Sequence, residues 1–203
     1  MINAVQARDY VPQDRLFVFW LHNSAAPRLV GALDLSPRLK GGVFQYADAW
    51  IKDGYSLSPD LPLQTGEFFP EAEHLPGAID DARPDRWGER IIQHVDRPKR
   101  LSVLEMLLLA GDDRFGALGV SISSDRYVPR TLGPYPRLAD VQALSHAVEA
   151  LQAQAPITPD IERLLKPGVT LGGARPKALL ETASGPHVVK FAELDDAVDT
   201  PLV

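Results

Sequence analysis

The segment that most constrains the fold of this chain is a glycine-rich loop, Thr170-Leu-Gly-Gly-Ala-Arg-Pro-Lys177. Phosphate loops of the Walker and Rossmann types open a helix, so that the phosphate meets a helix N-terminus. Here the loop is followed by a β-prone run (178–182), a Gly/Pro-rich turn (183–187) and a second β-prone run (188–191). The pattern therefore predicts a loop that leads into a β-hairpin.

Strand, glycine loop, strand and lysine is the order in which protein kinases cover ATP phosphates. The spacing differs from the usual eukaryotic one, and no G-x-G-x-x-G is present. If the turn is centred on Gly185, Thr182 should face Val188, and Lys190 should lie opposite Leu180. A lysine on a largely apolar face needs phosphate oxygens or water around its ammonium group.

Each of these residues also has a purely structural explanation. Edge-strand lysines commonly prevent aggregation, and spacing alone favours that explanation for Lys190. Gly172 and Gly173 could form a turn that requires positive φ, with Lys177 as a solvated flanking residue. The loop pattern alone therefore leaves both interpretations open.

Composition places the chain among ordinary globular proteins. Its 203 residues are 45% hydrophobic and 24% charged, which allows one large domain or two small ones. The absence of cysteine excludes a disulfide scaffold and fits a reducing cytosol, so we expect a cytoplasmic protein. A formal net charge of −6 argues against direct nucleic-acid binding, and no apolar run reaches membrane-spanning length.

The apolar patterns predict an α+β fold, with a mainly antiparallel sheet in an N-terminal subdomain and an incomplete kinase-like β-hairpin lobe after it. Expected strands lie at 16–21, 30–35, 42–46 and 118–122, and helices near 84–96 and 102–110 should cover the sheet. Further helical stripes span 138–151 and begin again after Pro159. Ser102 and Glu105 form a capping-box pattern, and Gly111 suits the residue after a helix end. A turn-rich stretch divides the expected domains into 1–130 and 131–203.

Two charged clusters have simpler explanations than ligand binding. Arg83, Arg86 and Arg90 are spaced to lie on one helix face, most simply a solvated face paired with Asp85 and Glu89. The pair of carboxylates at 112–113 lacks a third metal ligand, so a turn stabilised by the following arginine explains it better.

The glycine loop and its hairpin resemble the ATP-loop region of the HipA family, the serine/threonine kinase toxins of bacterial type II toxin–antitoxin systems. The resemblance extends upstream, in the same order, through Leu57-Ser-Pro-Asp-Leu-Pro-Leu63, Leu75-Pro-Gly77, Pro84-Asp-Arg-Trp-Gly88 and Gly111-Asp-Asp-Arg-Phe-Gly-Ala-Leu118. Each block is weak alone, but their shared order is fairly specific and spans nearly the whole chain after about residue 15.

The resemblance implies a set of functional residues and partners. It implies ATP contacts from Gly172, Gly173, Ala174, Arg175, Lys177 and Lys190. Thr170 stands where family kinases carry a serine that they autophosphorylate. ATP and Mg²⁺ are implied as cofactors of the complete kinase, none of them tightly bound to this chain. A helix-turn-helix antitoxin (HipB-like) is implied as partner, with an unknown protein substrate.

The segment after the hairpin lacks the remaining parts of a kinase. Thirteen residues follow Lys190, and none resembles a catalytic H-x-D-x-x-x-x-N loop or a magnesium aspartate motif. Thr200-Pro201 would begin a helix that the family continues into its catalytic lobe. We therefore expect the N-terminal portion of a longer kinase, inactive alone and completed by the missing lobe. The alternative is a stand-alone interaction module that binds and restrains a partner kinase.

Overall fold

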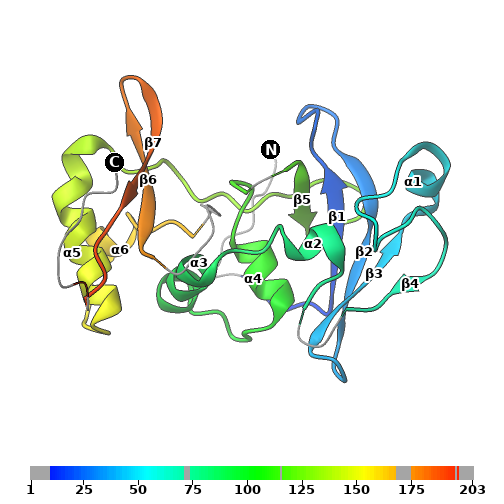
Figure 1. The fold of residues 1–203 in the computed structure, drawn as a ribbon, viewed down its shortest axis with the longest axis horizontal. Coiled ribbons are helices and arrows are strands. Elements are labelled where there is room, and N and C mark those ends of the chain that lie inside the picture. Colours follow the sequence, from blue (N-terminus) through cyan, green and yellow to red (C-terminus); the bar gives the residue numbers. More distant parts are fainter. Residues whose placement is uncertain (1–9, 71–73, 115, 168–174, 195, 197–203) are drawn as a thin grey trace.

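A five-stranded antiparallel sheet, in the order β4-β3-β2-β1-β5, forms the larger part of the fold, and a separate hairpin joins β6 and β7 (Figure 1). The computed structural model describes residues 10–70, 74–114, 116–167, 175–194 and 196. The strands are β1 (Arg15–Trp20), β2 (Arg28–Ser36), β3 (Gly41–Tyr46), β4 (Glu67–Phe68), β5 (Leu118–Ser121), β6 (Lys177–Thr182) and β7 (Gly185–Lys190). The expected α+β class is confirmed.

The helices are short and lie between and beside the strands. They are α1 (Asp48–Asp53), α2 (Gly77–Asp80), α3 (Arg86–Ile91), the π-helical turn η2 (Ile92–Asp96), α4 (Val103–Leu109), the 3₁₀ turn η3 (Leu138–Asp140), α5 (Val141–Gln152) and α6 (Pro159–Glu162). None of the helices in the described ranges combines the length and apolarity that a membrane span requires.

Helix α4 is the element that covers the sheet. All seven of its residues are buried, and its Leu104, Leu107 and Leu108 pack into one core with strand residues such as Leu16 and Phe44. Ser102 and Glu105 form the capping box that the sequence predicts. The helix ends at Leu109, and Gly111 follows with a φ of +77°, as the sequence pattern indicated.

Glu105 is a carboxylate buried within this apolar core, with 0% of its surface exposed. Arg100 donates two hydrogen bonds of 2.9 Å to it, and the Ser102 hydroxyl donates one of 2.5 Å. Tyr10 donates a further bond of 3.3 Å. Burial, helped by the charge of Glu105, raises the pKa of Tyr10 to about 12, so this hydroxyl keeps its proton at neutral pH.

Helix α3 does not cover the sheet, which corrects the expectation for residues 84–96. Its Trp87 and Ile91 pack instead with Leu144 and Val148 of α5 and with Leu180 of the hairpin. Helix α4 already fills the core against the sheet. The apolar side chains of α3 therefore pack toward α5 and the hairpin, away from the sheet (Figure 1).

Helix α3 has Asp85 as its N-cap and begins at Arg86, two residues after the expected start at 84. The register of the hairpin also differs from the sequence expectation. In the hairpin, Lys177 pairs with Lys190, and Leu180 pairs with His187. The register expected from a turn centred on Gly185 was therefore wrong. The turn is the tighter pair 183–184, and Gly185, with a φ of +106°, already belongs to β7.

The division into domains at about residue 130 stays a prediction. The core around the sheet is built from residues between Tyr10 and Val128. The second core combines α3, from the N-terminal segment, with α5, α6 and the hairpin. Any boundary near residue 130 therefore leaves one helix of the first segment packed in the core of the second.

We predict that Glu105→Gln lowers the free energy of unfolding by about 2 to 3 kcal/mol, since it leaves Arg100 without its main counter-charge. This value is below that for a fully buried pair because the Arg100 side chain is 31% exposed. Ser102→Ala, which removes one capping bond, should cost about 1 kcal/mol. Urea unfolding followed by circular dichroism measures both. Equal losses in the two variants would contradict a central role for the buried carboxylate.

Candidate functional site

The predicted phosphate-binding residues divide into two groups. Thr170, Gly172, Gly173 and Ala174 lie outside the described residues. Arg175, Lys177 and Lys190 are described, and all three lie at the base of the hairpin, where β6 begins and β7 ends. The candidate site is therefore built from the three cations at this end of the hairpin.

Lys177 is buried and ion-paired. Its Nζ lies 2.5 Å from Oδ2 of Asp85, and the two side chains are only 2% and 9% exposed. The same carboxylate caps α3, because its other oxygen accepts a bond of 2.8 Å from the Gly88 amide. One aspartate thus begins a helix and neutralises the first residue of β6, 92 positions later in the chain.

Trp87 of α3 also holds the backbone of β6. The indole Nε1 donates a hydrogen bond of 2.8 Å to the carbonyl oxygen of Lys177. On the other side of the hairpin, the Phe191 amide donates one of 2.9 Å to the Pro176 carbonyl. Both the main chain and the side chain of Lys177 are therefore held by α3, at the point where the chain leaves the glycine-rich segment.

Lys190 differs from Lys177 in its surroundings. The two residues are direct partners across the antiparallel pair, so their side chains leave the same face of the hairpin. Lys190 is exposed and forms no ion pair within the described part of the chain. Arg175 is engaged elsewhere, with its Nη2 at 2.7 Å from the Asp196 carboxylate. The structure thus brings together two of the predicted cations and directs the third to another partner.

The arginine stripe before and along α3 is tied to neighbouring groups, as the simpler explanation expected. Arg83 bonds Glu89 at 2.9 Å and Asp80 at 3.2 Å. The guanidinium of Arg90 lies 5.6 Å from the centre of the Trp87 ring. The expected pairing of these arginines with Asp85 is wrong, because that carboxylate holds Lys177.

The acidic pair at 112–113 is also a structural feature. Tyr127 and Tyr135 donate their hydroxyl hydrogen bonds to Asp112 and Asp113. Arg114 donates to the carbonyls of neighbouring residues, as expected, and its burial lowers the pKa of its guanidinium. Across the described ranges, no three His, Cys, Asp or Glu side chains are grouped so that they could hold a metal ion.

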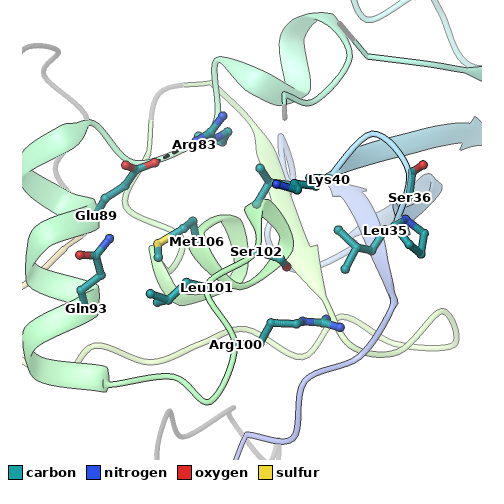
Figure 2. A pocket seen from close by; sticks show the side chains of 12 residues that line it. Leu35, Ser36, Lys40, Arg83, Glu89, Gln93, Arg100, Leu101, Ser102 and Met106 are labelled. Atoms are coloured by element: carbon teal, nitrogen blue, oxygen red, sulfur yellow. Dashed lines mark hydrogen bonds and ion pairs between the residues drawn. The ribbon is translucent and has the colours of Figure 1, made fainter. Parts of the chain in front are cut away.

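A cavity of about 510 Å³ lies beside the sheet, and no sequence pattern predicted it. Figure 2 shows side chains entering it from the β2–β3 turn, from α3 and from the loop before α4. Lys40, Arg83 and Arg100 line it, although the first and the last are 60 positions apart in the sequence. No local motif could signal this cavity, since three distant segments form it.

We predict that Asp85→Asn lowers the free energy of unfolding by about 3 to 5 kcal/mol, because it leaves the buried ammonium of Lys177 without a counter-charge. Asparagine is itself a good N-cap, so the loss would come from the ion pair and not from the cap. The matched control is Asp34→Asn, which breaks an exposed pair with Arg15 and should cost less than about 1 kcal/mol. Chemical unfolding of both variants tests this. Similar, small losses would show that the buried pair contributes little.

Comparison with known protein families gives a match for part of the chain. Residues 21–121 match the model of the family described as the HipA N-terminal domain. The match covers β2 to β5 together with Asp85 and Trp87, and it ends before α5 and the hairpin. No curated protein matches the chain.

Proposed function

Because residues 21–121 place this chain in the HipA family as its N-terminal domain, we propose that it is the N-terminal part of a HipA-like serine/threonine protein kinase. In this proposal the glycine-rich segment covers the phosphates of ATP, and the hairpin begins the ATP-binding lobe. The observation that carries it is the antiparallel strand β6, which begins at Lys177 directly after that segment. A strand at this position supports a kinase-type phosphate loop over the helix-opening types.

Lys190 is the stronger candidate for the lysine that contacts phosphate. It is exposed on β7, whereas the ammonium of its cross-strand partner Lys177 is buried against Asp85. Lys177 would have to share or leave that carboxylate in order to bind an anion. We therefore propose that Lys190 contacts ATP and that Lys177 anchors the neighbouring strand β6 to α3.

The remaining chemistry would come from a catalytic lobe. ATP supplies the phosphoryl group, and Mg²⁺ neutralises the charge that develops on it. These 203 residues contain no catalytic-loop motif after Lys190, so the proton acceptor and the magnesium carboxylate are proposed to lie on that lobe. A helix-turn-helix antitoxin is the proposed partner, since the family match supports a relation to toxin–antitoxin systems.

The second candidate function is a module that binds and restrains a partner kinase. The observation that favours it is the core of the sheet, whose residues all lie between Tyr10 and Val128. Such a core supports a domain that can act without the hairpin. Co-purification with a HipA-like kinase, together with inhibition of its activity, would favour this function over the first.

We predict that these 203 residues alone transfer no phosphate, because positioning and charge neutralisation supply most of the catalysis in phosphoryl transfer. Incubation with radiolabelled ATP and candidate protein substrates measures this. The same assay on the chain joined to a HipA-like catalytic lobe is the positive control. Label transfer by the chain alone that Lys190→Ala abolishes would contradict the prediction.

In that joined protein, Lys190→Ala should weaken ATP binding, measured by calorimetry, by about tenfold or more, the value of one charge-assisted hydrogen bond. Lys99→Ala, which removes another exposed lysine, should leave it unchanged. Thr170→Asp should weaken binding through the added negative charge, whereas Thr170→Val should not. If Lys190→Ala bound ATP normally, the proposed ATP site would be wrong. If Thr170→Asp bound ATP normally, the proposal that phosphorylation of Thr170 weakens ATP binding would be wrong.

A further inference from the structure

The cavity of about 510 Å³ beside the sheet has the size of a small-molecule site. Its apolar part is formed by Leu35 near the end of β2 and by Leu101, Val103 and Met106 around the start of α4. Leu101 is 59% exposed, although leucine side chains are usually buried. An apolar group bound in the cavity would cover this side chain and remove it from water, which is favourable.

The charged side chains of the lining already interact with other groups of the protein. Arg83 holds two carboxylates, one of which is Glu89 of the lining. Arg100 holds two more. Lys40 also has an interaction partner. A charged ligand would have to compete with these partners, whereas a neutral ligand would not, so the lining favours a neutral ligand.

Gln93 is an available polar side chain of this lining. It is exposed, and its amide group has no hydrogen-bond partner among the residues that the structure describes. It belongs to the π-helical turn η2, a type of turn that is rare and often occurs at functional sites. Figure 2 shows Gln93 and Glu89 on one side of the cavity, with Leu35 on the opposite side. A side-chain amide both donates and accepts hydrogen bonds, so a second amide group is its matched partner.

The opposite wall of the cavity contains a second irregular segment, the β2–β3 turn. In this turn Lys40 has a φ of +53°, in the left-handed region that few residues other than glycine adopt. Its amide donates a bond of 2.8 Å to the Ser36 carbonyl, and both residues line the cavity. Unfavourable backbone conformations concentrate at functional sites. The cavity thus joins two irregular segments that are distant in the sequence, which favours a binding site over a gap in the packing.

We propose that this cavity binds a small neutral molecule that carries one amide group on a short aliphatic body. The amide group pairs with the side-chain amide of Gln93, and the aliphatic body covers Leu101 and Met106. The proposal is independent of the proposed kinase function, because the cavity is lined by residues between 35 and 106 and the proposed ATP contacts lie beyond residue 169.

The test is a titration of the ¹⁵N-labelled 203-residue chain with hexanamide, followed by NMR. Hexanoate and hexylammonium are the comparison ligands, because they keep the aliphatic body and replace the neutral amide by a negative or a positive charge. Hexanamide should shift the amide signals of the lining residues. It should also bind more tightly than either comparison ligand by about fivefold or more, the value of one neutral hydrogen bond.

Two exposed residues of the lining can be changed without altering a buried core. Leu101→Ser should weaken hexanamide binding by about tenfold, because the aliphatic body loses an apolar contact. Its matched control is Leu138→Ser, since Leu138 is 64% exposed and lies outside the lining. Gln93→Ala should weaken binding by about fivefold, the value of one neutral hydrogen bond. Its matched control is Gln142→Ala, on the exposed side of α5, which should bind like the unmodified chain.

Melting temperatures separate binding from folding. All four variants should melt within about 2 °C of the unmodified chain, because exposed substitutions change stability little. Three results would overturn the proposal: no shifts around the cavity, hexanoate or hexylammonium bound as tightly as hexanamide, or unchanged hexanamide affinity in either Leu101→Ser or Gln93→Ala.

Discussion

The buried carboxylate of Glu105 is the interaction on which the rest of the structure depends. It caps the helix that covers the sheet, and it accepts bonds from Arg100 and Ser102 in the loop before α4 and from Tyr10 near the N-terminus. A carboxylate in an apolar core is unfavourable unless each of its oxygens is bonded, and here both are. The position of α4 therefore follows from polar satisfaction as much as from its leucines.

From α4 the structure extends in two directions. Its leucines pack on the sheet, while Met106 and Leu109 pack on Ile92, in the turn that continues α3. Helix α3 in turn carries Trp87 and Asp85, which hold the first residue of the hairpin. Two neighbouring helices thus connect the sheet to the proposed ATP-binding strands, and the cavity beside the sheet lies between them and the β2–β3 turn.

The sequence predicted those parts of the structure that depend on local pattern. The strands around Val18, Leu33 and Phe44, the capping box and the glycine after α4 follow from periodicity and backbone preference. The partner of α3 could not be predicted, because its apolar stripe fits a sheet or another helix equally well. The Lys177–Asp85 pair and the cavity join residues far apart in sequence, which no local signal reports. The predicted hairpin register was wrong because the same residues suit either a two-residue turn or a longer one.

The Lys177–Asp85 pair has a consequence for the order in which the molecule is assembled. The ribosome produces the chain from the N-terminus, so α3 can cap itself on Asp85 before β6 has been synthesised. The hairpin then finds a preformed acceptor, in which the indole of Trp87 and one carboxylate oxygen are already in position. Newly made β6 is thereby drawn onto a completed surface and away from free strand edges, which are the usual starting points of aggregation.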